Sequence, residues 1–170
     1  MDIPELENGK LYIFESTLNG QSGFDVPDVD GKSCNGVQLR NLYSVIDAYK
    51  QLGDVVVAWG PLLNNPLDIL DLEEVKLKFA EIHKSLIGSK YDANCYSLLS
   101  TIWPSLRPCR NFIEKLTCTS KWIFCSELVG IVLFEMGTLG ISYNPKDLTP
   151  FEIASNIPGL LKTVQSIAIK

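Results

Sequence analysis

The chain has 170 residues, 46% of them hydrophobic, which is the size and apolar fraction of one compact domain. Its 15 basic and 20 acidic residues give a formal net charge of -5, and without a long basic run a nucleic-acid partner is not expected. No stretch approaches the roughly 18 apolar residues of a membrane span, and the opening MDIPELENGK lacks the pattern of a signal peptide. We therefore expect a single cytosolic (cytoplasmic) domain over residues 1–170, with no transmembrane segment.

The cysteines predict free thiols and exclude the common metal sites. They form an odd set without a CxxC pair, and the chain has one histidine, so the usual Cys/His zinc spacings are absent. Free thiols are typical of a reducing compartment. We expect no metal and no other cofactor. The cysteines are Cys34, Cys95, Cys109, Cys118 and Cys125.

The first third of the chain predicts three strands and a short helix. Residues 10–16 form a β-branched and aromatic run that ends near Glu15, which is typical of a strand. Residues 36–42 alternate apolar and polar side chains and predict a second strand. The spacing of apolar residues in 42–51 predicts a short helix. The run DVVVAWGP, residues 54–61, predicts a third strand that is buried.

Two longer helices are predicted farther along the chain. Apolar residues recur at helical spacing over 67–87, and Gly88 follows as a C-cap. Residues 119–120 are N-cap types before the run WIFCSELVGIVLFEM, which is apolar nearly all round and stops at Gly137. We expect this second helix, residues 121–136, to be central and buried.

The last predicted helix start lies near the C-terminus. Thr149 is an N-cap residue type, and Pro150 follows at the first helical position. We expect a capped helix start here and then a last short helix or strand that ends at Lys170.

Cys125 is the candidate nucleophile. The predicted helix begins after Ser120 and places the thiol in its first turn, where free backbone N–H groups and the helix dipole favour a thiolate and lower the thiol pKa. The alternative is a structural role, because a cysteine beside Trp122, Ile123 and Phe124 is commonly a small core residue.

Five segments of the chain resemble one family in the same order. They are LYIFEST, GVQLRNL, GSKYD, FCSELVGIVLFEMGTLG and NPKDLTPFEIA. Together they resemble the permuted papain-like cysteine hydrolases of the NlpC superfamily, the YiiX-like group with its poxviral relatives. The resemblance implies an α+β papain-like fold, in which a small antiparallel sheet or half-barrel packs on a cysteine-bearing helix and the 67–87 helix lies on the flank.

The resemblance assigns most of a catalytic set and leaves one position empty. Cys125 matches the family's nucleophile, and Glu15 matches the polar residue on the strand after the catalytic histidine. The histidine itself has no match, because the corresponding residues are MDIPELENGK. His83 is the only imidazole in the chain, and beside Glu81 and Lys84 we expect it to be a solvated surface residue.

Three further residues could support the site. Tyr91 could line a substrate groove, although an aromatic there is also typical of the core. Ser126 and Glu127 follow the nucleophile on an otherwise apolar helix, where buried polar groups need partners. We expect both to be structural anchors.

Two functions are compatible with these residues. One is a thiol hydrolase that cleaves peptide, amide or lipid acyl bonds through an acyl-enzyme on Cys125. The alternative is a binding domain of the same fold, either catalytically inactive or truncated of its first, histidine-bearing strand. The sequence leaves the substrate and the oligomeric state open.

Overall fold

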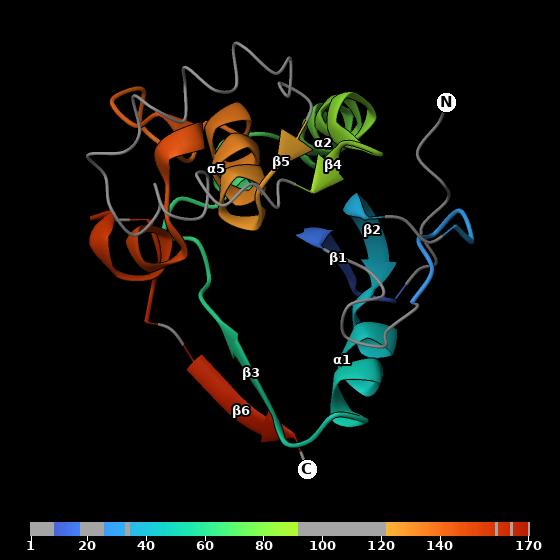
Figure 1. Cartoon of the computed structure of the whole chain (residues 1–170). Coiled ribbons are helices and arrows are strands. Elements are labelled where there is room, and N and C mark those ends of the chain that lie inside the picture. Colours follow the sequence, from blue (N-terminus) through green and yellow to red (C-terminus); the bar gives the residue numbers. More distant parts are fainter. Residues whose placement is uncertain are drawn as a thin grey trace.

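The computed structural model describes residues 9–17, 26–32, 35–91, 122–158, 160–163 and 165–169. These residues form a mixed α+β arrangement (Figure 1). The predicted N-cap residues 119–120 lie outside the described residues. The elements are β1 (Tyr12–Thr17), β2 (Gly36–Asn41), α1 (Leu42–Lys50), β3 (Val55–Trp59), the 3-10 turn η1 (Pro66–Asp68), α2 (Leu72–Leu86), β4 (Lys90–Tyr91), β5 (Trp122–Ile123), α5 (Cys125–Glu135), the 3-10 turn η3 (Pro145–Asp147), the π-helical turn η4 (Glu152–Asn156) and β6 (Gln165–Ile169).

The described strands form three separate two-stranded sheets rather than one. β1 pairs with β2 and β3 with β6, both antiparallel, whereas the short strands β4 and β5 are parallel. The prediction of small antiparallel sheets is therefore confirmed. The half-barrel is not formed by the strands that the structure describes, because no strand joins one pair to the next.

Strands β1 and β2 form the sheet on which the helices pack. Their register runs from Tyr12 opposite Asn41 to Thr17 opposite Gly36. Because side chains alternate along a strand, Phe14 and Val37 share the face that packs on α5. The polar positions of β2 are buried as well, with Gln38 0% and Arg40 3% exposed. Both faces of this predicted strand are therefore covered.

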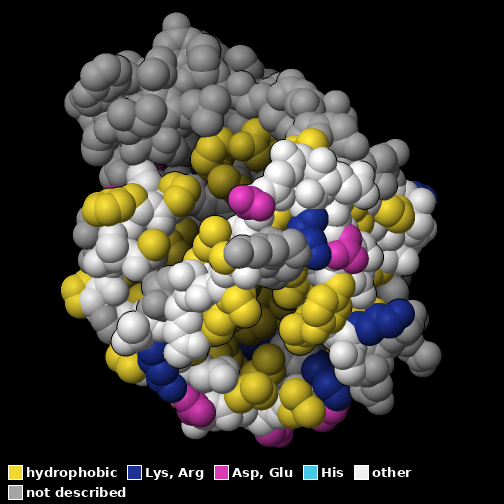
Figure 2. All heavy atoms as spheres, turned by 90° about the horizontal axis from the view of Figure 1, so that it is seen from below, with side chains coloured by type: hydrophobic (Ala, Val, Ile, Leu, Met, Phe, Trp, Pro, Cys, Tyr) yellow, Lys and Arg dark blue, Asp and Glu magenta, His cyan; other side chains and the backbone are white. Residues whose placement is uncertain are grey.

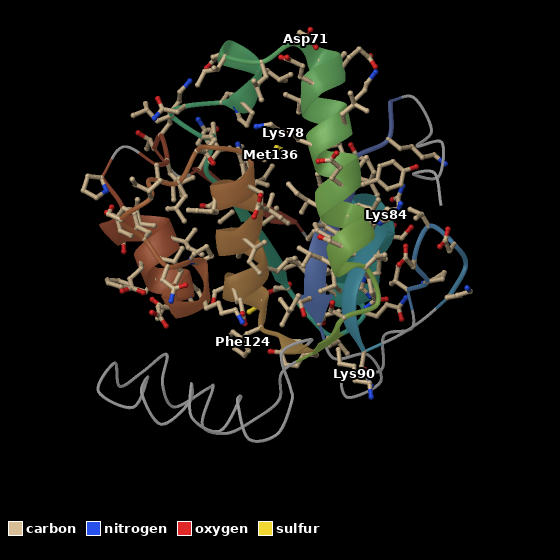
Figure 3. All side chains as sticks on the ribbon, turned by 90° about the horizontal axis from the view of Figure 1, so that it is seen from above. Asp71, Lys78, Lys84, Lys90, Phe124 and Met136 are labelled. Carbon is tan, nitrogen blue, oxygen red and sulfur yellow. The ribbon has the colours of Figure 1, made fainter. Side chains whose placement is uncertain are left out.

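Helices α2 and α5 lie side by side above this sheet (Figures 1 and 3). They run antiparallel, since α2 descends from Asp71 to Lys84 in Figure 3 while α5 rises from Phe124 to Met136. Between the helices and the sheet lies a cluster of buried side chains with partly buried ones packed on it. Its members are Val37, Ile123 and Leu128, with Phe14, Leu86 and Val132 around them.

Helix α5 is also covered from its other side, as the prediction of a central helix required. Leu133 packs with residues from the C-terminal third of the chain in a second cluster, with Leu139, Leu148 and Leu160. The helix ends where predicted, because Gly137 adopts a φ of 75° and the Thr138 and Leu139 amides donate to the Leu133 carbonyl. Its burial is incomplete, with Val129 40% and Phe134 36% exposed.

The prediction that β3 is a buried strand is wrong. Val56 is 66% exposed and Trp59 44% exposed, and on the partner strand Ile167 is 54% exposed. Among the described residues β3 pairs with β6 alone, and this two-stranded ribbon lies away from α2 and α5 (Figure 1). Figure 2 views the molecule from this side and shows hydrophobic side chains around a hollow. An apolar run of five residues therefore does not by itself decide burial.

Helix α2 begins later than the apolar spacing predicted. Asp71 caps it, since its carboxylate accepts from the Glu74 amide at 2.8 Å and the Glu74 carboxylate accepts from the Asp71 amide at 3.2 Å. The preceding residues form the separate turn η1. The predicted C-cap is confirmed, with Gly88 at a φ of 75°. Neither α2 nor any other described helix is long and apolar enough to cross a membrane.

The capped start predicted near the C-terminus is also present. The Glu152 amide donates to Thr149 Oγ1 at 3.1 Å, and the Thr149 amide donates to Glu152 Oε2 at 2.8 Å. The last element is the strand β6, one of the two forms that the sequence allowed.

Candidate functional site around Cys125

Cys125 is the first residue of α5, which confirms its predicted place in the first helical turn. The helix begins four residues later than predicted, because Trp122 and Ile123 form strand β5 and Phe124 is the extended N-cap residue, with φ -79° and ψ 158°. The thiol therefore follows directly after a strand-to-helix junction. A side chain in this position lies beside backbone N–H groups that have no acceptor within the helix.

The predicted lowering of the Cys125 pKa is wrong. Burial raises the pKa of this thiol, and the neighbouring amides of Ser126 and Cys125 itself, which lower it, offset only part of that effect. The loss of water around the thiolate thus outweighs the helix N-terminus. At neutral pH the group is mainly the neutral thiol, which is the less reactive form.

Glu127 stabilises the start of α5. Its side chain is 4% exposed, and Oε1 lies 3.8 Å from Lys146 Nζ. Its Oε2 accepts from the Phe124 amide at 3.4 Å, which satisfies one of the free N–H groups at the helix start. Ser126, beside it, is 4% exposed. These contacts agree with the expectation that Glu127 is an anchor of the helix.

Tyr91 lies next to the start of α5. It belongs to β4, which is parallel to β5 and places Tyr91 opposite Ile123. Its ring centroid is 5.5 Å from that of Phe124, with the planes tilted by 45°. Because Phe124 precedes Cys125 directly, the structure brings Tyr91 to the candidate site.

Glu15 is on a strand beside the site, but its carboxylate points elsewhere. The next residue, Ser16, donates from Oγ to the Ile123 carbonyl at 2.7 Å, so β1 contacts the segment that leads into Cys125. Alternation along the strand then directs Glu15 to the opposite face of the sheet. There its Oε1 accepts from Arg40 Nε at 2.7 Å and also from the terminal guanidinium nitrogen of Arg40.

His83 is buried, so the prediction of a solvated surface histidine is wrong. The residue is 9% exposed. Its ring centroid lies 5.6 Å from that of Phe14 and 6.4 Å from that of Phe79. Its Nε2 is buried without a hydrogen-bond partner. The two phenyl rings also contact each other, with centroids 5.6 Å apart, so the only imidazole of the chain belongs to a cluster of three rings from the sheet and α2.

The sequence does contain a signal for this burial. Phe79, Ile82, His83 and Leu86 follow the i, i+3, i+4, i+7 spacing of one helix face, so they form one stripe of the helix. The charged neighbours Glu81 and Lys84 lie outside this stripe. The position of His83 within this stripe predicts its burial, whereas the charged residues that flank it in the sequence do not.

The His83 environment gives a prediction for the pH dependence of stability. Burial lowers the pKa of His83 from 6.5, while Asp28 and Asp30 oppose this effect. Below pH 6.5 the unfolded state binds a proton that the folded state does not, so the free energy of unfolding should fall on acidification and level off below the folded-state pKa. His83→Met should remove this contribution.

Urea unfolding between pH 8 and pH 5 checks the prediction. At lower pH, Asp28 changes the free energy of unfolding in the opposite direction to His83. Burial raises the pKa of its carboxyl from 3.8, so protonation of Asp28 favours the folded state. The informative quantity is therefore the difference between the wild type and His83→Met. Lys84→Met, at the exposed neighbouring position, should keep the wild-type pH dependence. An identical pH dependence in wild type and His83→Met would contradict the burial argument.

Comparison with models of protein families, with curated proteins and with solved structures finds no match to this chain. Functional conclusions therefore depend on the residues around Cys125. Those residues are a half-buried thiol at a helix start and an aromatic pair at the preceding residue. The imidazole is buried and packs against Phe14 and Phe79.

Proposed function

We propose that this chain is a domain of the permuted papain-like cysteine hydrolase type in which Cys125 accepts acyl groups from activated donors, and that it cleaves amides poorly. The observation that carries the proposal is the place of Cys125 at the first residue of α5. There the backbone amides of the first turn can stabilise negative charge on the sulfur or on an oxygen that develops beside it. Tyr91 and Phe124, the residue before Cys125, form an aromatic pair at the start of the helix.

The weak activity toward amides follows from the missing acid and base. A cysteine hydrolase uses an imidazole to hold the thiolate and to protonate the leaving amine. His83 is buried against Phe14 and Phe79, and Glu15 is bound by Arg40. Loss of a positioned acid/base typically lowers the rate by about 10² to 10⁴. Peptide, amide and unactivated lipid acyl bonds should therefore be poor substrates.

An activated ester avoids this requirement. In nitrophenyl acetate the Cys125 thiolate attacks the carbonyl carbon, the C–O bond breaks, and nitrophenolate leaves with the electron pair and needs no proton. The product is an S-acetyl cysteine. Because burial raises the pKa of the thiol, the acylation rate should still be rising as the pH passes from 7 to 9.

The test measures both substrates on the same preparation. We expect a burst of nitrophenolate, an acetyl group on Cys125 in peptide mass mapping, and no turnover of the matching nitroanilide. Cys125→Ser should remove the label at this position. His83→Met should leave acylation within about twofold of wild type, since the imidazole has no part in it.

Other outcomes separate the competing functions. If the wild type turns over the nitroanilide and Cys125→Ala does not, the chain is a complete hydrolase. If His83→Met keeps that turnover, the catalytic base is a residue other than His83. Failure of Cys125 to acylate under conditions in which the other cysteines do would overturn the proposal and support a binding domain of the same fold.

A further inference from the structure

A groove lies between α2 and α5 and is lined by residues of both helices. It has a volume of about 480 Å³, within the range of about 300 to 1,000 Å³ that ligand pockets occupy. Residues 78, 82 and 86 of α2 line it at four-residue spacing, and residues 131 and 135 of α5 do the same. The two antiparallel helices therefore present facing stripes along about 12 Å of α2.

The two ends of the groove differ in character. Its apolar part consists of Ile82, which is 6% exposed, with the half-buried Leu86 and Ile131. The charged part contains the exposed side chains of Lys78 and Glu135. These two lie together because the middle of α2 faces the C-terminal end of α5, and Figure 3 shows Lys78 directed from α2 toward Met136.

The charged residues of the groove are not paired with one another. Glu81, on α2, is the third of them. Within the part of the chain that the structure describes, no ion pair or side-chain hydrogen bond involves Lys78, Glu81 or Glu135. Two carboxylates and one ammonium group thus line the groove beside its apolar residues, with their charges available.

We propose that this groove binds a zwitterionic amphiphile with a single short tail. The tail covers the apolar floor of Ile82, Leu86 and Ile131, where burial of apolar area supplies the affinity. The ammonium group of the ligand lies between Glu81 and Glu135, and its anionic group pairs with Lys78. A zwitterionic ligand complements all three side chains. A simple amine pairs only with the two carboxylates, and a simple fatty acid pairs only with Lys78.

The groove is independent of the acyl-accepting thiol. With 100° per residue, Ile131 and Glu135 lie roughly 80 to 120° around α5 from Cys125. The ligand therefore does not occupy the thiol's face of the helix. Failure of Cys125 acylation and failure of binding in the groove can be observed separately on the same protein.

The test uses three probes with the same ten-carbon chain. Isothermal titration below their micellar concentrations compares 2-aminodecanoate, decylamine and decanoate at pH 7. We expect 2-aminodecanoate to bind most tightly. Its advantage over each single-charge probe should be about two- to fivefold, because an exposed ion pair contributes at most about 1 kcal/mol.

Substitutions of the acidic and the basic residue should change the relative affinities of decylamine and decanoate in opposite directions. Glu135→Gln should weaken 2-aminodecanoate and decylamine by about two- to fivefold and leave decanoate unchanged or tighter. Lys78→Gln should weaken 2-aminodecanoate and decanoate and strengthen decylamine. Asp47→Asn, which removes an exposed carboxylate from α1, is the matched control and should change none of the three affinities.

A substitution in the floor tests the tail. Ile131→Ser should weaken all three probes by about tenfold, because each loses the same apolar contact. Equal affinities for the three probes in the wild type, or the same response of all three to Glu135→Gln and Lys78→Gln, would overturn the zwitterion proposal. Absence of binding by 2-aminodecanoate at millimolar concentration would overturn the site itself.

Discussion

Gly36→Ala is expected to lower the free energy of unfolding by about 3 kcal/mol or more, the range of severe core defects. Gly36 opens β2 with a φ of 136°, which residues with a side chain rarely adopt. A Cβ built on it would lie 1.9 Å from the Ser89 carbonyl oxygen, which is backbone and has no rotamer to change. The same oxygen accepts from the Val37 amide at 2.8 Å, so a shift that relieves the clash also breaks this bond.

The matched control is Gly53→Ala. Gly53 has a φ of 149°, and a Cβ there would have no atom within 4 Å. Both substitutions cause backbone strain at a positive φ. The difference between their losses in free energy of unfolding therefore measures the cost of the clash with the Ser89 carbonyl oxygen. Urea unfolding should show a loss of about 1 kcal/mol for Gly53→Ala. Equal losses in the two variants would contradict the steric argument.

Glu15→Leu is expected to lower the free energy of unfolding by about 3 to 5 kcal/mol. The side chain of Arg40 is 4% exposed and that of Glu15 18% exposed, and the two are joined by the Nε–Oε1 hydrogen bond of 2.7 Å. Removal of the carboxylate leaves a buried guanidinium without the negative charge of Glu15 beside it. Arg40→Leu should be similarly destabilising, because it leaves the carboxylate at the same interface.

The double variant Glu15→Leu/Arg40→Leu should recover most of the loss, since a pair of apolar side chains avoids the burial of one unpaired charge. The exposed pair of Lys76 and Glu73 is the control, and its disruption should change stability by at most about 1 kcal/mol. Urea unfolding of all variants provides the comparison. Unchanged stability in Glu15→Leu together with slower acylation of Cys125 would assign Glu15 to the site instead.

Local elements of this protein follow from the sequence. The strands around Phe14 and Val37 appear in their alternating patterns, and α2 and α5 end at Gly88 and Gly137. The capped start at Thr149 is also present. Each of these features depends on a pattern or on interactions among residues at most about six positions apart, or on the backbone freedom of one glycine, so a single segment contains the information.

The site shows the limit of this reasoning. Cys125 is at the helix start, as its neighbours indicated, yet the sign of its pKa shift was predicted incorrectly. The helix N-terminus is a local feature, whereas burial depends on segments remote in sequence, such as β1 and β4, that pack beside it. Tyr91 reaches the site through strand pairing with β5, which spacing along the chain does not reveal.

Tertiary structure alone decided which surfaces are covered. It left the apolar strand β3 exposed, buried His83 against Phe14, and directed Glu15 to Arg40 instead of Cys125. It also formed the groove between two helices that are about 40 residues apart in the chain. Helix caps and the alternation along strands could be predicted because they depend on residues within one segment. Burial and charge pairing needed the assembled fold, because they depend on which other segment removes water from a given face.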